Sequence, residues 1–122
     1  MPLIKAAAER AIQLDGTSAE ARASLATFKL FYEYDWAAAE REFRQAITLN
    51  PNYSFAHDQF GLGLACHGRF DEAVTEGRRA IELDPLSPQV LRDAAATLSY
   101  QHITRRRLSK FSERPNSIPL QP

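Results

Sequence analysis

Three similar segments recur along this chain at a nearly regular interval. They read AIQLDG, AITLNP and AIELDP and end at Gly16, Pro51 and Pro85, so that they lie 35 and then 34 residues apart. A fixed period of about 20–50 residues is typical of repeat architectures, in which each unit is a small supersecondary element that buries its apolar face against its neighbours. A chain of 122 residues is long enough for a short array of such units.

Each unit has the pattern of two helices. Apolar residues follow the three- and four-residue spacing of amphipathic helices, and no run of period two is long enough to indicate a strand. Asp35 is placed to cap a helix that begins at Trp36. Pro51 and Pro85 each end a helix, because proline lacks the amide hydrogen that a helix needs. The sequence therefore predicts an all-α chain of helix–turn–helix pairs.

Several residues coincide when the repeats are aligned. The segments AEREFRQAITLNP and AVTEGRRAIELDP match without a gap at an offset of 34 residues, which places Ala39, Ala46 and Pro51 against Ala73, Ala80 and Pro85. Paired helices, this period, small residues where helices cross and a closing proline resemble the tetratricopeptide repeat. The resemblance implies a right-handed α–α superhelix, a solenoid of antiparallel helix pairs. The segment DWAAAEREFRQAITLNP also resembles tetratricopeptide arrays in bacterial signalling and regulatory proteins.

The resemblance assigns two full repeats and a half repeat at each end. After residue 102 the pattern stops, and a basic, proline-rich composition predicts a tail that is mostly disordered, with only weak helix character over 103–111. The predicted division is 1–16 (second helix of a partial repeat), 17–53 and 54–87 (tetratricopeptide repeats), 88–102 (first helix of a partial repeat) and 103–122 (the tail).

Two departures from the family pattern carry expectations of their own. The first full repeat has one extra residue between Ala21 and Asp35, which either lengthens the turn near Tyr34 or forms a π-bulge in the helix. In the second full repeat, Gly77 stands where the family has an aromatic residue late in the second helix. The missing side chain predicts a gap, which Tyr100 is one candidate to fill.

Composition narrows the class of protein. The net charge is zero, and 44% hydrophobic with 25% charged residues is ordinary for a soluble chain, so neither a nucleic acid nor a membrane is indicated as partner. The single cysteine, Cys66, cannot form a disulfide within the chain, which fits a reducing, cytoplasmic location. The tail has Arg105–Arg107 and Lys110, but no aromatic platform or reading helix accompanies them, and a solvated charge run is favoured over nucleic-acid binding.

No set of residues indicates catalysis. The three histidines, His57, His67 and His102, are not spaced as metal ligands or as members of a catalytic triad. Gly61 and Gly63 lie within a predicted helix and lack the following glycine and lysine of a phosphate loop, so close helix crossing explains Gly61 better. The sequence predicts a chain that is not an enzyme and uses no metal and no cofactor.

The first helix of each full repeat has the candidate binding surface, because such helices line the concave side of a curved solenoid. A groove of this kind fits an extended or helical peptide. Family members that grip a carboxylate use lysine and asparagines at positions that here are Ala23, Thr27, Asp58 and Leu62. The sequence thus predicts a mostly apolar groove with one acidic spot. The ten candidates are Ala23, Ser24, Thr27, Leu30, Phe31, Phe55, Asp58, Gln59, Leu62 and Cys66.

We therefore expect a non-catalytic module for protein–protein interaction. Phe31, Phe55 and Leu62 are expected to anchor a partner peptide and Asp58 to select for polarity, although packing between repeats is an equal alternative for the aromatic residues. A second possibility is self-assembly, in which exposed apolar residues on the end helices stack one chain on another. A third is that the chain is a fragment of a larger bacterial regulator.

Overall fold

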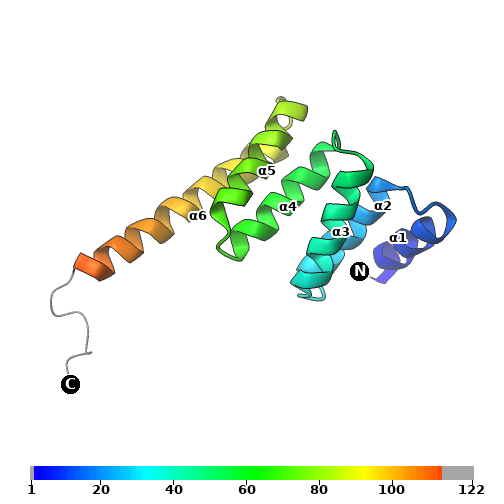
Figure 1. Cartoon of the computed structure of the whole chain (residues 1–122), viewed down its shortest axis with the longest axis horizontal. Helices are drawn as coiled ribbons and strands as arrows, with labels where there is room; N and C mark the ends of the chain where they lie inside the picture. The colour runs from blue at the N-terminus through cyan, green and yellow to red at the C-terminus, as the bar shows by residue number, and fades with distance from the viewer. Residues whose placement is uncertain (1, 114–122) are drawn as a thin grey trace, which may run out of the picture.

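The computed structural model describes residues 2–113 (Figure 1). Within this range every regular element is an α-helix, and no described residue lies in a strand. The predicted all-α fold class is confirmed. The six helices are α1 (Pro2–Leu14), α2 (Ala19–Phe31), α3 (Trp36–Leu49), α4 (Ser54–Cys66), α5 (Phe70–Leu83) and α6 (Pro88–Glu113).

The helices form two layers. Each helix packs on the next along the chain, and α4 also contacts α2 and α6, so that α2, α4 and α6 lie side by side in one layer. The second layer is formed by α1, α3 and α5 (Figure 1). Helix pairs stacked in this way form a solenoid, whose inner layer is the surface that such folds present to partners.

Local sequence signals set where the helices begin. The Ser18 hydroxyl accepts a 3.1 Å hydrogen bond from the amide of Ala21 at the start of α2. At the start of α3 the Asp35 carboxylate accepts a 3.2 Å bond from the amide of Ala38, as the sequence predicts. These bonds satisfy amide groups that have no partner within the helix.

The extra residue of the first repeat lies in a turn. Four residues, 32–35, connect α2 to α3, whereas three, 67–69, connect α4 to α5. Both turns contain a left-handed residue, Gly68 with φ +77° and Tyr34 with φ 53°. Because α2 is α-helical throughout, the longer turn is the correct alternative and the π-bulge is not.

The core follows from large side chains set against small ones. Phe43, Phe60 and Leu64 are fully buried, and the rings of Phe43 and Phe60 stack with centroids 5.5 Å apart. A Cβ added to Gly61 would lie 3.3 Å from the carbonyl oxygen of Ala73, so α4 and α5 approach closely at this glycine, as predicted. At Gly63 the Trp36 ring takes the space of a side chain, since an added Cβ would lie 2.5 Å from its Cζ3.

The last helix is longer than the sequence predicts. We expect it to end near residue 102, but α6 continues to Glu113, and Figure 1 shows its carboxyl half extending beyond α4 and α5. No proline or glycine interrupts the chain between Pro88 and Glu113, and Arg and Lys are good helix formers that suit the carboxyl end of a helix. The structure therefore has a regular helix over 103–111, where only weak helix character is expected, and the prediction of disorder is wrong for residues 112 and 113. The rest of the predicted tail lies outside the described residues.

The helices also bear on the membrane question. In the described range, no helix combines the length and the apolar character needed to cross a bilayer.

Candidate functional site

The ten residues predicted to line the groove divide by exposure. Phe31 and Cys66 are exposed, with 43% of the Phe31 surface accessible. Four residues are half-buried on the inner layer, namely Ser24, Thr27, Phe55 and Leu62. The remaining four, Ala23, Leu30, Asp58 and Gln59, are buried by helix packing. The expectation that these four face outward is wrong, because packing against neighbouring helices buries them, as α3 and α4 bury Ala23 and Leu30.

The half-buried members serve packing and surface together. Phe55 packs against a buried alanine cluster of α2, α3 and α4, with its ring centroid 5.9 Å from that of Tyr53. The Thr27 hydroxyl donates a 2.9 Å hydrogen bond to the carbonyl of Ala23 on its own helix. Leu62, whose side chain is entirely apolar, is half-buried. Packing between repeats thus accounts for the burial of part of the Phe55 side chain.

Asp58 is an acid buried where α4 meets α6. Only 4% of its surface is exposed, and its Oδ2 accepts a 3.1 Å hydrogen bond from the Gln59 amide. Burial raises the pKa of Asp58, and a hydrogen bond with Asp93 and the negative charge of Asp93 raise it further. The Gln59 amide and the charge of Arg92 oppose this rise, and the resulting pKa is about 7. Asp58 therefore keeps its proton at pH values well above those at which a carboxyl group usually loses it.

Replacing Asp58 by asparagine is expected to stabilise the protein at pH 8. The unfolded carboxyl loses its proton near pH 3.8 and the folded one near 7, so stability falls as pH rises through this range. Asparagine keeps the shape without the ionisation, and the free energy of unfolding should rise by at least about 1 kcal/mol at pH 8, with little change at pH 4. Urea denaturation at both pH values measures this difference.

The matched control is Asp84→Asn, because Asp84 is exposed in the turn after α5. It should leave the difference between the two pH values unchanged. An Asp58→Asn protein that is less stable than the parent at pH 8 would contradict the assignment of a buried, protonated carboxyl.

Two cavities open between α4 and α6. The first has a volume of about 340 Å³ and is bordered by Phe55, Asp58 and Val90 near the amino ends of both helices. The second has a volume of about 410 Å³ and is bordered by Cys66 of α4 and by Tyr100 and Thr104 of α6. The α6 residues are absent from the ten candidates, because only the first helices of the two full repeats were considered, and Thr104 lies beyond the predicted end of its helix.

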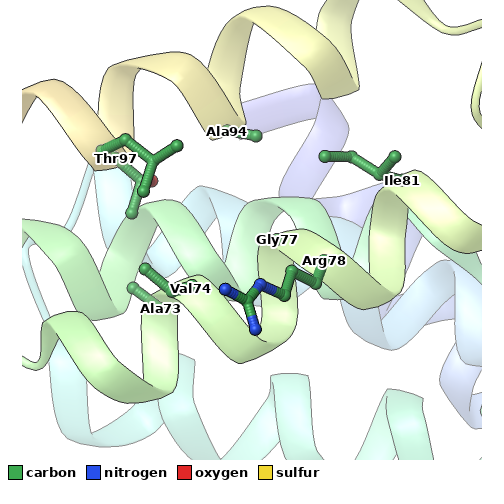
Figure 2. A pocket seen from close by; sticks show the side chains of 8 residues that line it. Ala73, Val74, Gly77, Arg78, Ile81, Ala94 and Thr97 are labelled. Carbon is green, nitrogen blue, oxygen red and sulfur yellow. The ribbon is translucent and has the colours of Figure 1, made fainter.

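A third hollow lies on the other side of α6, against α5 (Figure 2). It has a volume of about 90 Å³ and is bordered by Gly77, where the repeat pattern predicts a gap. Figure 2 shows Ala94 and Thr97 of α6 facing it. Tyr100 does not fill the gap, since its side chain is exposed and borders the cavity beside Cys66 instead.

Two of the three histidines, His57 and His67, have structural roles. The His57 ring joins two elements, with Nδ1 2.9 Å from the Glu76 carboxylate and Nε2 2.8 Å from the carbonyl oxygen of Pro51. The His67 ring stacks on Trp36 with centroids 4.6 Å apart, and its Nδ1 bonds the carbonyl of Gly63 at 2.9 Å. Among residues 2–113 no group of three metal-ligating side chains is found. His57 and His67 therefore belong to the packing of the helices.

The basic residues of α6 lie outside these cavities. Arg105, Arg106, Arg107 and Lys110 are exposed on the carboxyl half of the helix. Arg105 approaches Asp71 of α5 at 4.0 Å, the outer limit of an ion pair. These four residues form an exposed cationic surface on α6 that does not border the cavities between α4 and α6.

Comparison with known proteins rests on structure. No protein-family model matches the sequence, and no curated protein matches it. The second TPR domain of human RPAP3, solved by NMR with the HSP70 peptide SGPTIEEVD, has 26% identity and a TM-score of 0.66, over 76% of this chain and 77% of that one. The Arabidopsis OM64 TPR domain has 20% identity and a TM-score of 0.68, over 76% of each chain. The chain has the tetratricopeptide-repeat fold.

A third tetratricopeptide-repeat neighbour is longer. MamA has 22% identity and a TM-score of 0.68, and the match covers 88% of this chain but 58% of MamA. The tetratricopeptide-repeat fold explains why the small residues of both repeats are buried at helix crossings, as Ala39 and Ala73 are. It also explains the hollow at Gly77, where the large side chain typical of the repeat is missing.

Proposed function

We propose that the chain is a non-catalytic protein–protein interaction module that binds a partner peptide or helix on its inner layer. The observation that carries this proposal is that Phe31 of α2 and Leu62 and Phe55 of α4 keep accessible apolar surface, and that Phe55 also borders a cavity between α4 and α6. A recurring mode of peptide recognition places apolar side chains into such a groove. The RPAP3 domain, which holds a peptide, supports this use of the fold.

The partner that fits best is apolar rather than acidic. The positions that a carboxylate-gripping groove would fill with lysine and asparagine are Ala23, Thr27, Asp58 and Leu62. Asp58 borders the cavity beside Phe55, and its pKa of about 7 means that a second carboxylate nearby would raise the cost of ionisation further. These four positions therefore offer no cationic side chain to an acidic peptide such as SGPTIEEVD, the peptide in the RPAP3 complex.

Selection from a displayed library of random dodecapeptides tests the groove. We expect the intact chain to enrich peptides with a shared apolar motif, and Leu62→Glu to weaken binding of the best peptide at least about tenfold, because a charge would enter an apolar contact. Leu86→Glu is the matched control, since Leu86 lies exposed in the turn between α5 and α6. No enrichment, or equal binding by both glutamate variants, would refute the groove assignment.

The remaining parts of the proposal concern context. A lack of catalysis is supported by the structural use of His57 and His67. A cytoplasmic location is supported by the single cysteine, Cys66. The likeness of residues 35–51 to arrays of bacterial signalling proteins supports a bacterial regulatory setting.

A further inference from the structure

The two ends of the solenoid expose apolar helix faces. On α6, Leu91 and Leu98 are 46% and 53% exposed, and Ala95 between them is exposed as well. On α1, Ala7 is exposed and borders a hollow of about 350 Å³ between α1 and α2. Contiguous apolar surface of this kind marks a site of interaction.

The positions on these faces correspond to a contact that the chain makes twice internally. In each full repeat, the fourth residue of the first helix pairs with a glutamate seven residues before the end of the second helix. These pairs are Arg22–Glu42 at 3.1 Å and His57–Glu76 at 2.9 Å. At the ends of the solenoid the same positions are Leu91 of α6 and Ala7 of α1. Both of these residues are apolar, so an apolar contact between the two ends would replace the polar pairs found inside the chain.

The small residues of a helix crossing are also present at both ends. The eighth residue of the first helix is buried at the crossing in each full repeat, as Ala26 and Gly61. Its counterpart in α6 is the exposed Ala95. The residue three before the end of the second helix is Ala46 or Ala80, both fully buried, and its counterpart in α1 is Ala11. Each end helix therefore has half of a crossing that the described chain does not complete.

We propose that α6 of one copy pairs with α1 of a second copy as α2 pairs with α3, so that two half repeats form one repeat. In this arrangement Leu91 contacts Ala7, and Ala95 and Ala11 allow the close crossing. The hollow at Gly77 (Figure 2) lies beside the exposed face of α6 and receives apolar side chains of the incoming α1. The hollow between α1 and α2 in turn receives the apolar face of α6.

This contact joins two different surfaces and is therefore heterologous. A heterologous contact that does not close produces an open chain of copies. Light scattering after size exclusion, over a hundredfold range of concentration, should give an average mass that rises without a plateau at the dimer. A mass that stays at 13.7 kDa throughout would overturn the proposal.

Two single variants test which surfaces meet. Leu91→Glu blocks the α6 end and Ala7→Glu blocks the α1 end, because each buries a charge in an apolar contact. Both residues are exposed, so folding should be kept, and far-UV circular dichroism checks this. Each variant alone should remain a monomer, whereas an equal mixture should form a dimer, because each variant supplies the end that the other lacks. Leu86→Glu, the control in the exposed turn, should assemble like the parent.

Other occupants of these faces give different results. Pairing of α6 with α6 would leave Ala7→Glu able to dimerise alone, which would refute the head-to-tail contact. A mixture that stays monomeric would refute it as well. The alignment of α6 on α1 is tested by the double variant Leu91→Arg with Ala7→Glu, which recreates the Arg22–Glu42 pair between copies. The double variant should associate more strongly than Leu91→Arg alone or Ala7→Glu alone. If the double variant associates no more strongly than these single variants, the alignment is wrong.

Discussion

Replacing Phe43 by alanine is expected to lower the free energy of unfolding by about 3–5 kcal/mol. The Phe43 side chain is fully buried between the two full repeats, and its ring stacks on that of Phe60. Ala39 and Ala73 on either side are too small to fill the space that a truncated residue would leave. A cavity is therefore added to the loss of buried apolar area. Equilibrium unfolding in urea measures the change.

The matched control for this prediction is Phe31→Ala. Phe31 is the same residue type on the neighbouring helix α2, but much of its ring is exposed, so its truncation should cost less than about 1 kcal/mol. Equal losses at the two positions would contradict the core that the packing defines. A large change in the urea dependence of Phe43→Ala would instead indicate that the two repeats no longer unfold together.

The repeat period predicted the architecture because one period corresponds to one pair of helices, which buries its apolar face against the next pair. Gly61 was identified as a crossing residue from its place in the repeat, and a Cβ added there would make a tight 3.3 Å contact with the carbonyl oxygen of Ala73 on α5. The turn of the extra residue was one of two alternatives, since sequence alone does not say whether a helix or a turn absorbs it. In the structure the turn absorbs the extra residue, and Tyr34 within that turn has a left-handed backbone conformation.

The surface was harder to predict than the core. Asp58 and Gln59 were expected in the groove because the first helices of the repeats line the concave side, but helix packing buries both, with Asp93 of α6 beside Asp58. The length of α6 was missed because composition was given more weight than the absence of proline and glycine between residues 88 and 114. Exposure depends on which helix lies opposite, and the spacing of residues within one repeat does not contain that information.

The groove and the ends are separate surfaces, so both proposals can hold together. The proposed groove lies along the inner layer of α2, α4 and α6, and the proposed contact between copies joins α6 to α1 at the ends. Because the contact continues the order of helices within the chain, α2 of the second copy would follow α6 of the first in the inner layer. Assembly would then lengthen the groove, and peptides that span two copies would bind more tightly at higher protein concentration.

The pair His57–Glu76 is expected to make stability fall as pH rises from 5.5 to 8.5. Burial alone would lower the pKa of His57. The hydrogen bond to Glu76, the bond to the Pro51 carbonyl and the charge of Glu76 outweigh burial and the opposing charge of Arg79, so the pKa is raised above 6.5. The folded state thus holds the proton more tightly than the unfolded state. The contribution is fully present below pH 6.5 and is lost as pH rises through the folded pKa.

Asp58 contributes a slope of the same sign, so the measurement is made in an Asp58→Asn background. In that background, Glu76→Ala should lower the free energy of unfolding by about 1.5–3 kcal/mol at pH 5.5, where it removes a hydrogen bond from a charged imidazolium. At pH 8.5 the loss should be smaller, because the ring is then less charged. His57→Gln should remove the pH slope. Equal losses on Glu76→Ala at both pH values would mean that His57 is neutral in the folded protein, and that Glu76 accepts a bond from an uncharged ring.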